Sequence, residues 1–437
     1  MGNMPRGRLV LGHTEAGWAL SGPEHGLLVL GPPRSGKTTG VIVPNVRVAP
    51  GAVVSTSTKR DVLLATAADR ARLGTCWLYD PSGAGPTPSG VELLRWSPIP
   101  AALDWDAARK AAGAMVAAAR PDDRGDSAFW SERAGTMLGP LLHAAALSER
   151  PMREVVHWAD QMEASTAIAI LETAGADMAV SSVSGVVNRD AREQSGVWST
   201  ISSILSPYRS EAALETTVGH NFDADAFVRS NDTIYVCSTG REQSGAAPLI
   251  VGLLEEIREA RYRLSDREGE TGRETLLFAL DEVANIAPLP KLPQLVSEGA
   301  GQGVLTLACL QDLSQARRRW GAEADGFLTL FGAKLLLPGV ADVRTLEAVS
   351  ALIGQHDVPV PSTSRTGWLK GRRSWSTRRQ PRLAVDELRR GRPGCALVLE
   401  SDREPGWVAL VPRRARERSG PAQERGLEGP GSGGRGL

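Results

Sequence analysis

Eight residues near the amino terminus have the spacing of a phosphate-binding loop. Residues 31–38 read Gly-Pro-Pro-Arg-Ser-Gly-Lys-Thr, which satisfies the pattern GxxxxGK[ST]. In such a loop backbone N–H groups converge on phosphate oxygens, Lys37 reaches the β- and γ-phosphates, and the Thr38 hydroxyl binds Mg²⁺. The helix that follows would turn its positive end towards the same anion. The predicted ligands are ATP and Mg²⁺, and the predicted nucleotide contacts are Gly31, Pro32, Arg34, Ser35, Gly36, Lys37, Thr38 and Thr39.

Two adjacent acids and a glutamine would complete a hydrolytic site. The apolar stretch 275–280 ends in Asp281 and Glu282, so both carboxylates are expected at the end of a buried strand. We expect Asp281 to hold Mg²⁺ through water, and Glu282 to act as the general base for the attacking water. The stretch 303–310 ends in Gln311, which is predicted to contact the γ-phosphate. An acidic helix cap is the alternative interpretation of the two acids, but the P-loop favours hydrolysis.

The segments that carry these residues are short and continuously apolar. Such runs occur at 27–31, 51–58, 75–81, 232–239, 274–282, 303–311 and 333–339. Strands buried on both faces of a parallel sheet have this pattern, whereas half-exposed strands alternate. Helices are predicted at 59–74 and 248–264. The sequence therefore predicts an α/β fold with a RecA-like P-loop core and a largely parallel sheet.

A long region between the strands near 80 and 232 lacks strand patterns. Ala-rich and amphipathic stretches at 104–120, 129–149 and 152–174 predict helices there. We expect 1–99 and 226–415 to form the two parts of the nucleotide-binding domain, and 100–225 to form an inserted all-helical domain. The Gly- and Pro-rich tail 416–437 is predicted to be disordered.

The composition limits the other classes of function. The 437 residues include 50 basic and 50 acidic side chains, so binding to DNA or a membrane must use local patches. The four cysteines lie far apart without a CxxC pair, which fits buried reduced thiols better than a zinc site. The longest apolar run, 327–340, is too short to span a bilayer and contains Lys334. We therefore expect no transmembrane segment in this chain.

One local patch is strongly basic. Residues 364–382 contain seven Lys or Arg and no Asp or Glu, with Trp368 and Trp375 between them. Because Arg and Lys contact phosphates and Trp stacks on unpaired bases, a DNA-binding loop or hairpin is one hypothesis. A solvated basic loop, or a contact with an acidic partner, is the alternative. The residues assigned to DNA are Arg365, Lys370, Arg372, Arg373, Arg378 and Arg379.

Taken in order, these motifs resemble the coupling proteins of type IV secretion, the TraG/TraD-like ATPases of conjugative DNA transfer. The resemblance runs from about 27 to 412, and its motifs include VLGPPRSGKTTGVIVPNV (29–46), FWSERAGTML (129–138), WSTISSILSPYR (198–209) and LDEVANIAPLPKLPQLVSEGAGQG (280–303). It implies a RecA-like ATPase with an inserted helical domain that forms a hexameric ring with ATP between subunits. The implied partners are a DNA or DNA–protein (relaxase-type) cargo and secretion-channel components. By position, Lys37, Thr38, Asp281, Glu282 and Gln311 match the family's nucleotide site.

Three departures from the family pattern affect these expectations. Most members carry N-terminal transmembrane helices, whereas this sequence shows none. We therefore expect a cytoplasmic chain that a partner holds at the inner face of the membrane, or a chain that is truncated or specialised. Residues 57–61, Ser-Thr-Lys-Arg-Asp, replace Asp-Pro-Lys-Gly-Glu, so the first acid is missing. Residues 299–301, Gly-Ala-Gly, replace a segment in which relatives often carry an arginine that reaches a neighbour's nucleotide. The candidates to replace that arginine are Arg317, Arg318, Arg319 and Arg344.

Three functions fit this pattern. The first is an ATP-driven motor that moves DNA or nucleoprotein. The second is an adaptor that receives the substrate and uses ATP as an assembly switch, which the absent anchor and arginine favour slightly. The third is a DNA pump of the FtsK/HerA kind, which shares the core but not FWSERAGTML or the acid-pair segment.

Overall fold

The centre of the molecule is one large twisted sheet. The computed structural model describes residues 5–83, 85–120, 126–238, 243–268, 275–364 and 372–410. The sheet strands are β1 (Val10–Thr14), β2 (Gly17–Leu20), β3 (Leu27–Leu30), β4 (Val53–Ser57), β5 (Cys76–Tyr79), β6 (Glu92–Leu93), β7 (Thr233–Cys237), β8 (Leu276–Leu280), β9 (Val304–Leu310), β10 (Ala333–Leu336), β13 (Cys395–Glu400) and β14 (Arg403–Ala409). Their order in the sheet is β2-β1-β14-β13-β10-β3-β9-β8-β4-β7-β5-β6.

Eight neighbouring strands, from β10 to β6, run parallel. They include every strand that the apolar runs predict, which confirms the RecA-like α/β fold class. The remaining strands, β13, β14, β1 and β2, pair antiparallel and extend one side of the sheet. The sequence analysis does not predict these four. The pattern is weak there because β14 contains Glu, Pro and Gly, and β2 has only four residues.

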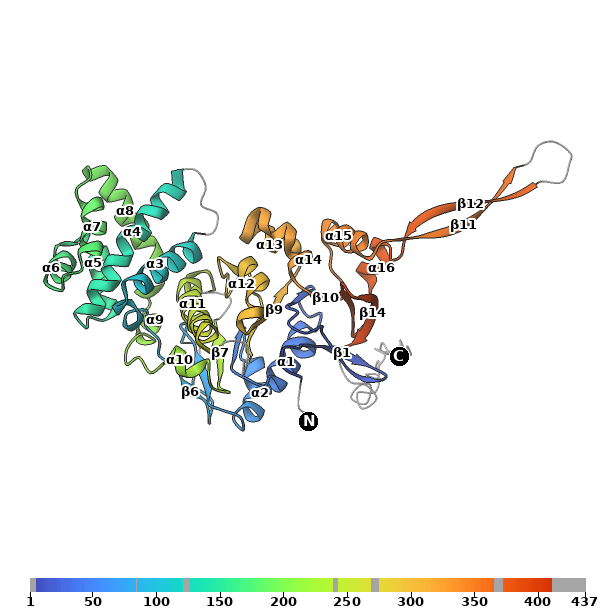
Figure 1. Cartoon of the computed structure of the whole chain (residues 1–437), viewed down its shortest axis with the longest axis horizontal. Helices are drawn as coiled ribbons and strands as arrows, with labels where there is room; N and C mark the ends of the chain where they lie inside the picture. The colour runs from blue at the N-terminus through green and yellow to red at the C-terminus, as the bar shows by residue number, and fades with distance from the viewer. Residues whose placement is uncertain are drawn as a thin grey trace, which may run out of the picture.

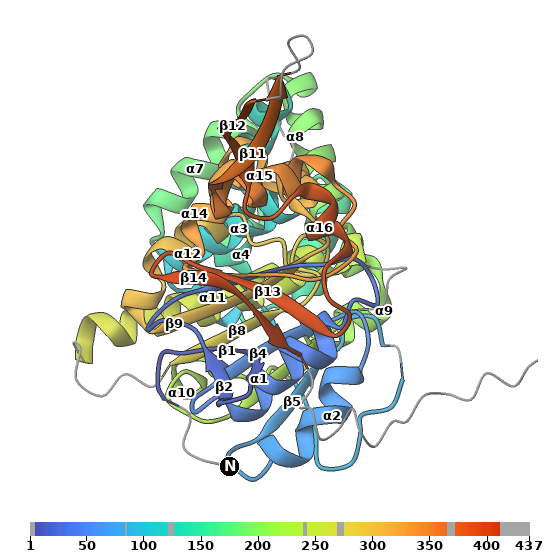
Figure 2. The same ribbon diagram turned by 90° about the vertical axis from the view of Figure 1, so that its right-hand side faces the viewer.

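Helices cover both faces of this sheet (Figure 2). Alternate residues of β3 face opposite ways, so Leu27 and Val29 pack against one group of helices, and Leu28 and Leu30 against the other. The first face is covered by α1 (Val43–Val48) and α2 (Asp61–Arg70). The second is covered by α11 (Gln243–Glu268), α12 (Leu292–Glu298), α13 (Leu313–Trp320), α14 (Phe327–Leu330), α15 (Val343–Ile353) and α16 (Val385–Arg390).

A group of helices occupies one end of the molecule (Figure 1). It comprises η2 (Pro100–Leu103), α3 (Trp105–Ala119), α4 (Asp126–Leu147), α5 (Met152–Gln161), α6 (Ser165–Thr173), α7 (Asp177–Val187), α8 (Ala191–Ile204), η3 (Ser206–Arg209) and α9 (Glu211–Glu215). The short helix α10 (Ala224–Phe227) lies beside α11 at the sheet. The helix predicted over 152–174 is divided, because Met162 adopts a left-handed φ of 51° that ends α5. Met115 in α3 and Phe278 in β8 belong to one buried cluster. The domain limits at 100 and 225 stay a prediction.

A separate two-stranded hairpin, β11 (Gln355–Ser364) and β12 (Arg372–Pro381), projects from the other end (Figure 1). The predicted loop or hairpin in the basic patch is therefore a hairpin along its described residues. Two short 3₁₀ segments, η4 (Ala300–Gln302) and η5 (Gly321–Gly326), lie before β9 and after α13. The tail 416–437 lies outside the described residues. None of the described helices is both long enough and apolar enough to cross a membrane.

Candidate nucleotide-binding site

The predicted P-loop forms the turn between β3 and the first helix of the core. Backbone hydrogen bonds hold it at both neighbouring strands, since Gly31 N donates to Leu310 O at 3.1 Å and Leu337 N donates to Leu30 O at 2.8 Å. The loop curls because Arg34 and Gly36 both have positive φ, 64° and 96°. Glycine adopts such a φ freely, whereas Arg34 is strained there by about 1–2 kcal/mol.

The helix after the loop begins as a wide π-helical turn, η1 (Thr38–Ile42), before α1. Val43 N donates to Thr38 O, five residues back. Pro44 has no N–H and cannot donate to the preceding turn, which is a local reason for the irregular start. Single π turns of this kind are common at functional sites. This turn places the Thr38 side chain at the mouth of the loop.

Two side chains of the loop, Lys37 and Ser35, differ in their hydrogen bonding within the protein. Lys37 is only 6% exposed, and its Nζ donates to the carbonyl oxygens of Gly31 and Pro32. The hydroxyl of Ser35 is buried and has no hydrogen-bond partner among the described residues. A buried hydroxyl without a partner is costly. Both groups fit an anion in the loop, because phosphate oxygens would accept from Ser35 and Lys37.

Thr38 and Asp281 meet across the sheet, 243 residues apart in sequence. Thr38 Oγ1 donates to Asp281 Oδ2 at 2.6 Å. Asp281 Oδ1 accepts from the N–H of Glu282, and the hydroxyl of Thr56 at the end of β4 donates to the Asp281 carbonyl at 3.0 Å. Hydroxyl and carboxylate oxygens are the ligands that Mg²⁺ prefers. The structure therefore brings together the two residues that are predicted to hold Mg²⁺.

Burial raises the pKa of the Asp281 carboxyl above its ordinary value, because water no longer solvates the charge. The Thr38 hydrogen bond and the nearby Lys37 oppose this shift, whereas the negative charges of Glu282 and Asp61 add to it. A divalent cation would stabilise the ionised form of Asp281.

Glu282 lies just after the end of β8, and Gln311 lies just after the end of the neighbouring strand β9. Glu282 has a left-handed φ of 53°, and its Oε2 accepts from Asn285 Nδ2 at 3.0 Å. Gln311 follows β9, which lies between the P-loop strand β3 and the acid-pair strand β8. Both side chains are half-buried. Thr56 and Asn285, which hold Asp281 and Glu282, were not predicted. The only signal for Thr56 is its place at a strand end.

The structure divides the four candidate arginines into two groups. Arg317 pairs with Asp325 and Asp342, and Arg319 donates to the carbonyl oxygens of Ala118 and Pro288. Arg318 and Arg344 are exposed. They lie on α13 and α15, whose first turns meet where Leu313 N donates to Thr345 Oγ1. Residues 299–301 precede β9 and so lie at the opposite edge of the sheet from the P-loop.

The residues predicted to contact DNA are only partly described. Arg365 and Lys370 lie outside the described residues. Arg372 and Arg373 are on β12, and their backbone alone is described. Arg378 and Arg379 are exposed on the same strand, away from the P-loop.

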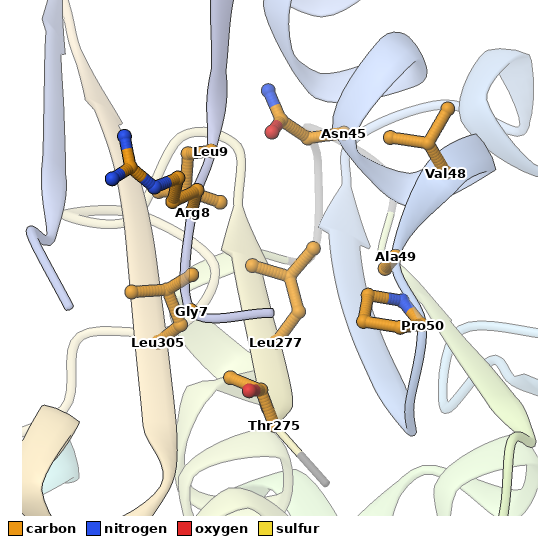
Figure 3. A pocket seen from close by; sticks show the side chains of 10 residues that line it. All are labelled: Gly7, Arg8, Leu9, Asn45, Val48, Ala49, Pro50, Thr275, Leu277 and Leu305. Atoms are coloured by element: carbon orange, nitrogen blue, oxygen red, sulfur yellow. The ribbon is translucent and has the colours of Figure 1, made fainter. Parts of the chain in front are cut away.

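A small apolar pocket lies at the edge of the sheet opposite the P-loop (Figure 3). Its lining includes Leu277 and Leu305 at the starts of β8 and β9, together with Leu9 and Ala49. The P-loop and acid pair follow the carboxyl ends of parallel strands, where ligands bind in open α/β sheets. This pocket is therefore separate from the candidate nucleotide site.

The parallel strand order, the P-loop after β3 and the acid pair after β8 define a P-loop protein with a RecA-like core. The chain belongs to the type IV secretory system conjugative DNA transfer family, whose model matches residues 6–405. The family resemblance of the sequence motifs is thereby confirmed.

Individual relatives agree with this assignment. The chain is 24% identical over 411 residues to the conjugal transfer protein TraG of Escherichia coli, and the match covers 85% of this chain and 62% of that protein. The chain thus spans less than two thirds of this relative.

Among solved structures, the conjugative coupling protein TrwBdeltaN70 superposes with a TM-score of 0.70 at 18% identity, over 92% of this chain and 89% of that one. TrwB in complex with a non-hydrolysable GTP analogue superposes with a TM-score of 0.68 at 18% identity, over 94% and 96%. These likenesses establish the fold.

Proposed function

We propose that this chain is the ATP-hydrolysing motor that couples a DNA or DNA–protein cargo to a type IV secretion channel during conjugation. The observation that carries the proposal is the hydrogen bond from Thr38 to Asp281, with Glu282 and Gln311 at the same edge of the sheet. Family membership supports the role in conjugative DNA transfer. Solved TrwB structures with an ATP analogue, and with ADP and Mg²⁺, support ATP and Mg²⁺ as ligands.

Each residue has a distinct part in the proposed hydrolysis. Lys37 exchanges its carbonyl partners for the β- and γ-phosphates. Thr38 and Asp281 hold Mg²⁺, which neutralises charge on the phosphates. Glu282 accepts a proton from water as the water oxygen attacks the γ-phosphorus and the bond to the β–γ bridging oxygen breaks. Gln311 lies between these groups, where it can contact the γ-phosphate and follow its loss.

The assembly proposed for this motor is a homo-hexamer with ATP sites between subunits. Arg318 or Arg344 would complete a neighbour's site, because both are exposed and the segment 299–301 carries no arginine. Secretion-channel components or a membrane-anchor protein would hold the ring at the inner face of the membrane. Cations of the β11–β12 hairpin and its tip would contact the DNA: Arg365, Lys370, Arg372, Arg373, Arg378 and Arg379.

ATP hydrolysis measured with and without single- and double-stranded DNA tests the proposal. Wild-type protein should hydrolyse ATP faster with DNA, whereas Lys37→Ala and Glu282→Gln should lose hydrolysis. Lys110→Ala is the matched control, because Lys110 is exposed on α3 and pairs with Glu259 far from the P-loop. Hydrolysis that survives Lys37→Ala would place the site elsewhere. ATP binding without any DNA stimulation would favour the adaptor over the motor.

A further inference from the structure

The β11–β12 hairpin has little contact with the rest of the protein. Its ten-residue strands pair from Gln355↔Pro381 to Ser364↔Arg372, and it extends beyond the helices of the body (Figure 1). All the described side chains of β12 from Trp375 to Pro381 are exposed. A two-stranded hairpin is marginally stable on its own in water. Such an arm is therefore suited to bind a partner.

The strand register divides the hairpin into two faces with different chemistry. Directly paired residues share a face, and successive residues alternate between faces. We call one face the Trp375 face, formed by Asp357, Pro359, Trp375, Thr377 and Arg379. The opposite face carries His356, Val358, Val360, Ser376, Arg378 and Gln380. The arginines predicted to bind DNA are thus split, with Arg379 beside the tryptophan and Arg378 behind it.

The Trp375 face combines an exposed aromatic ring with positive charge. The Trp375 side chain is 68% exposed, although tryptophan is normally largely buried. Arg379 lies four residues nearer the base of the hairpin, on the same face as Trp375. Successive same-face positions are about 6.8 Å apart along a strand. The ring and the Arg379 position therefore lie on one continuous strip, roughly 14 Å apart along the strand.

A single carboxylate is present on this strip. Asp357 Oδ1 lies 3.6 Å from Arg379 Nε, and both side chains are solvent-exposed, 61% and 80%. Between 355 and 381 the sequence contains six Lys or Arg and only this one acid. Exposed ion pairs contribute little to stability, so the pair can open readily for a competing anion. The charge of the hairpin favours a polyanion as its partner.

We propose that the Trp375 face binds single-stranded nucleic acid, with an unpaired base stacked on Trp375 and a nearby phosphate of the same strand at Arg379. The flat indole needs the open face of a base, which a duplex buries between its neighbours. The inference depends on the proposed function only in taking nucleic acid as the cargo. It assigns the contact with an unpaired strand to one face of the hairpin.

Binding of a fluorescent oligothymidylate to the full chain, followed by anisotropy, tests this inference. Trp375→Ala should weaken binding by about ten-fold or more, since stacking on one aromatic contributes that much, and Trp375→Phe should restore most of it. Arg379→Ala should weaken binding and flatten its salt dependence, because one phosphate contact is lost. Arg378→Ala, which removes an equally exposed arginine from the opposite face, should have a clearly smaller effect.

Asp357→Asn provides a test by gain of affinity. Removing the carboxylate frees Arg379 and reduces repulsion of phosphate, so binding should tighten, and a fold defect cannot imitate that result. Unchanged oligothymidylate binding in both Trp375→Ala and Asp357→Asn would overturn the inference. The inference would also be overturned if Trp375→Ala changed the mass of the assembly but left the affinity of each subunit for the oligonucleotide intact. That result would identify the hairpin as a contact between subunits.

The ATPase assay separates this inference from the proposed function. If DNA stimulates ATP hydrolysis by the wild-type protein but the hairpin variants bind the oligonucleotide normally, only the proposed Trp375 contact is refuted. If the wild-type protein does not bind DNA and its ATP hydrolysis does not change with DNA, the proposed function is refuted as well. Equal loss of duplex and single-strand binding in Trp375→Ala would contradict the preference for unpaired bases.

Discussion

The hydroxyl of Thr38 donates a 2.6 Å hydrogen bond to the carboxylate of Asp281, joining the P-loop to the acid pair across β9. The two side chains satisfy each other's hydrogen bonding within the protein. The same two oxygens would face Mg²⁺ once nucleotide binds. Breaking the contact should therefore affect both folding and hydrolysis.

Thr38→Val removes the hydroxyl and keeps the shape of the side chain. We expect the ligand-free protein to lose about 1–3 kcal/mol, because the buried Asp281 carboxylate loses a donor. ATP hydrolysis should fall to the level of Lys37→Ala. Thr38→Ser is the control and should keep both properties. Chemical denaturation and phosphate release measure the two effects, and full activity in Thr38→Val would contradict the role of Thr38.

Asp281 should make the stability of the ligand-free protein depend on pH. Its pKa is raised by burial above the ordinary 3.8, so the folded state holds the proton more tightly than the unfolded state. Its contribution to the free energy of unfolding must therefore fall as pH rises from 3.8 through the higher folded pKa. Asp281→Asn lacks this change, so its stability relative to wild type should improve with rising pH. Urea unfolding over that range tests this, and a difference that does not vary with pH would contradict it.

Gly40 marks a close approach between the P-loop helix and the last described strand. A Cβ at Gly40 would lie 2.8 Å from Leu410 Cβ, too close for either backbone to stay in place. Gly40→Ala should cost about 1–3 kcal/mol through overpacking. The double variant Gly40→Ala/Leu410→Gly should lose less free energy of unfolding than the two single variants lose in total, because the smaller side chain makes room for the added methyl group. Gly113→Ala in α3 is the control, since no atom lies within 4 Å of its added Cβ, and thermal unfolding compares all four.

The parts of this protein that sequence predicts well are those set by local patterns. The central strands are buried on both faces, so their apolar runs mark them, and Lys37, Thr38, Asp281 and Glu282 lie in short motifs. Contacts between distant segments are different. Thr56 holds the Asp281 carbonyl from 225 residues away, and no local pattern records that pairing. Strands β1, β2 and β14 escape prediction because Gly, Pro or charged residues interrupt their apolar pattern, whereas the apolar run of β13, CALVLE, is a signal that could have found it.

Arg318 and Arg344 should determine whether a neighbouring subunit completes the nucleotide site. Both are exposed near the nucleotide edge, whereas Arg317 and Arg319 are engaged within the subunit. If one of these arginines contacts the nucleotide of a neighbouring subunit, Arg318→Ala or Arg344→Ala should lower the rate of ATP hydrolysis and leave ATP binding unchanged. The reason is that such an arginine stabilises the charge of the transition state. Mixing that variant with Lys37→Ala subunits should then restore activity, since each supplies the half-site that the other lacks. Arg317→Ala should instead lower thermal stability by losing its ion pairs. Normal hydrolysis in both Arg318→Ala and Arg344→Ala, or no recovery on mixing, would mean that neither arginine acts between subunits.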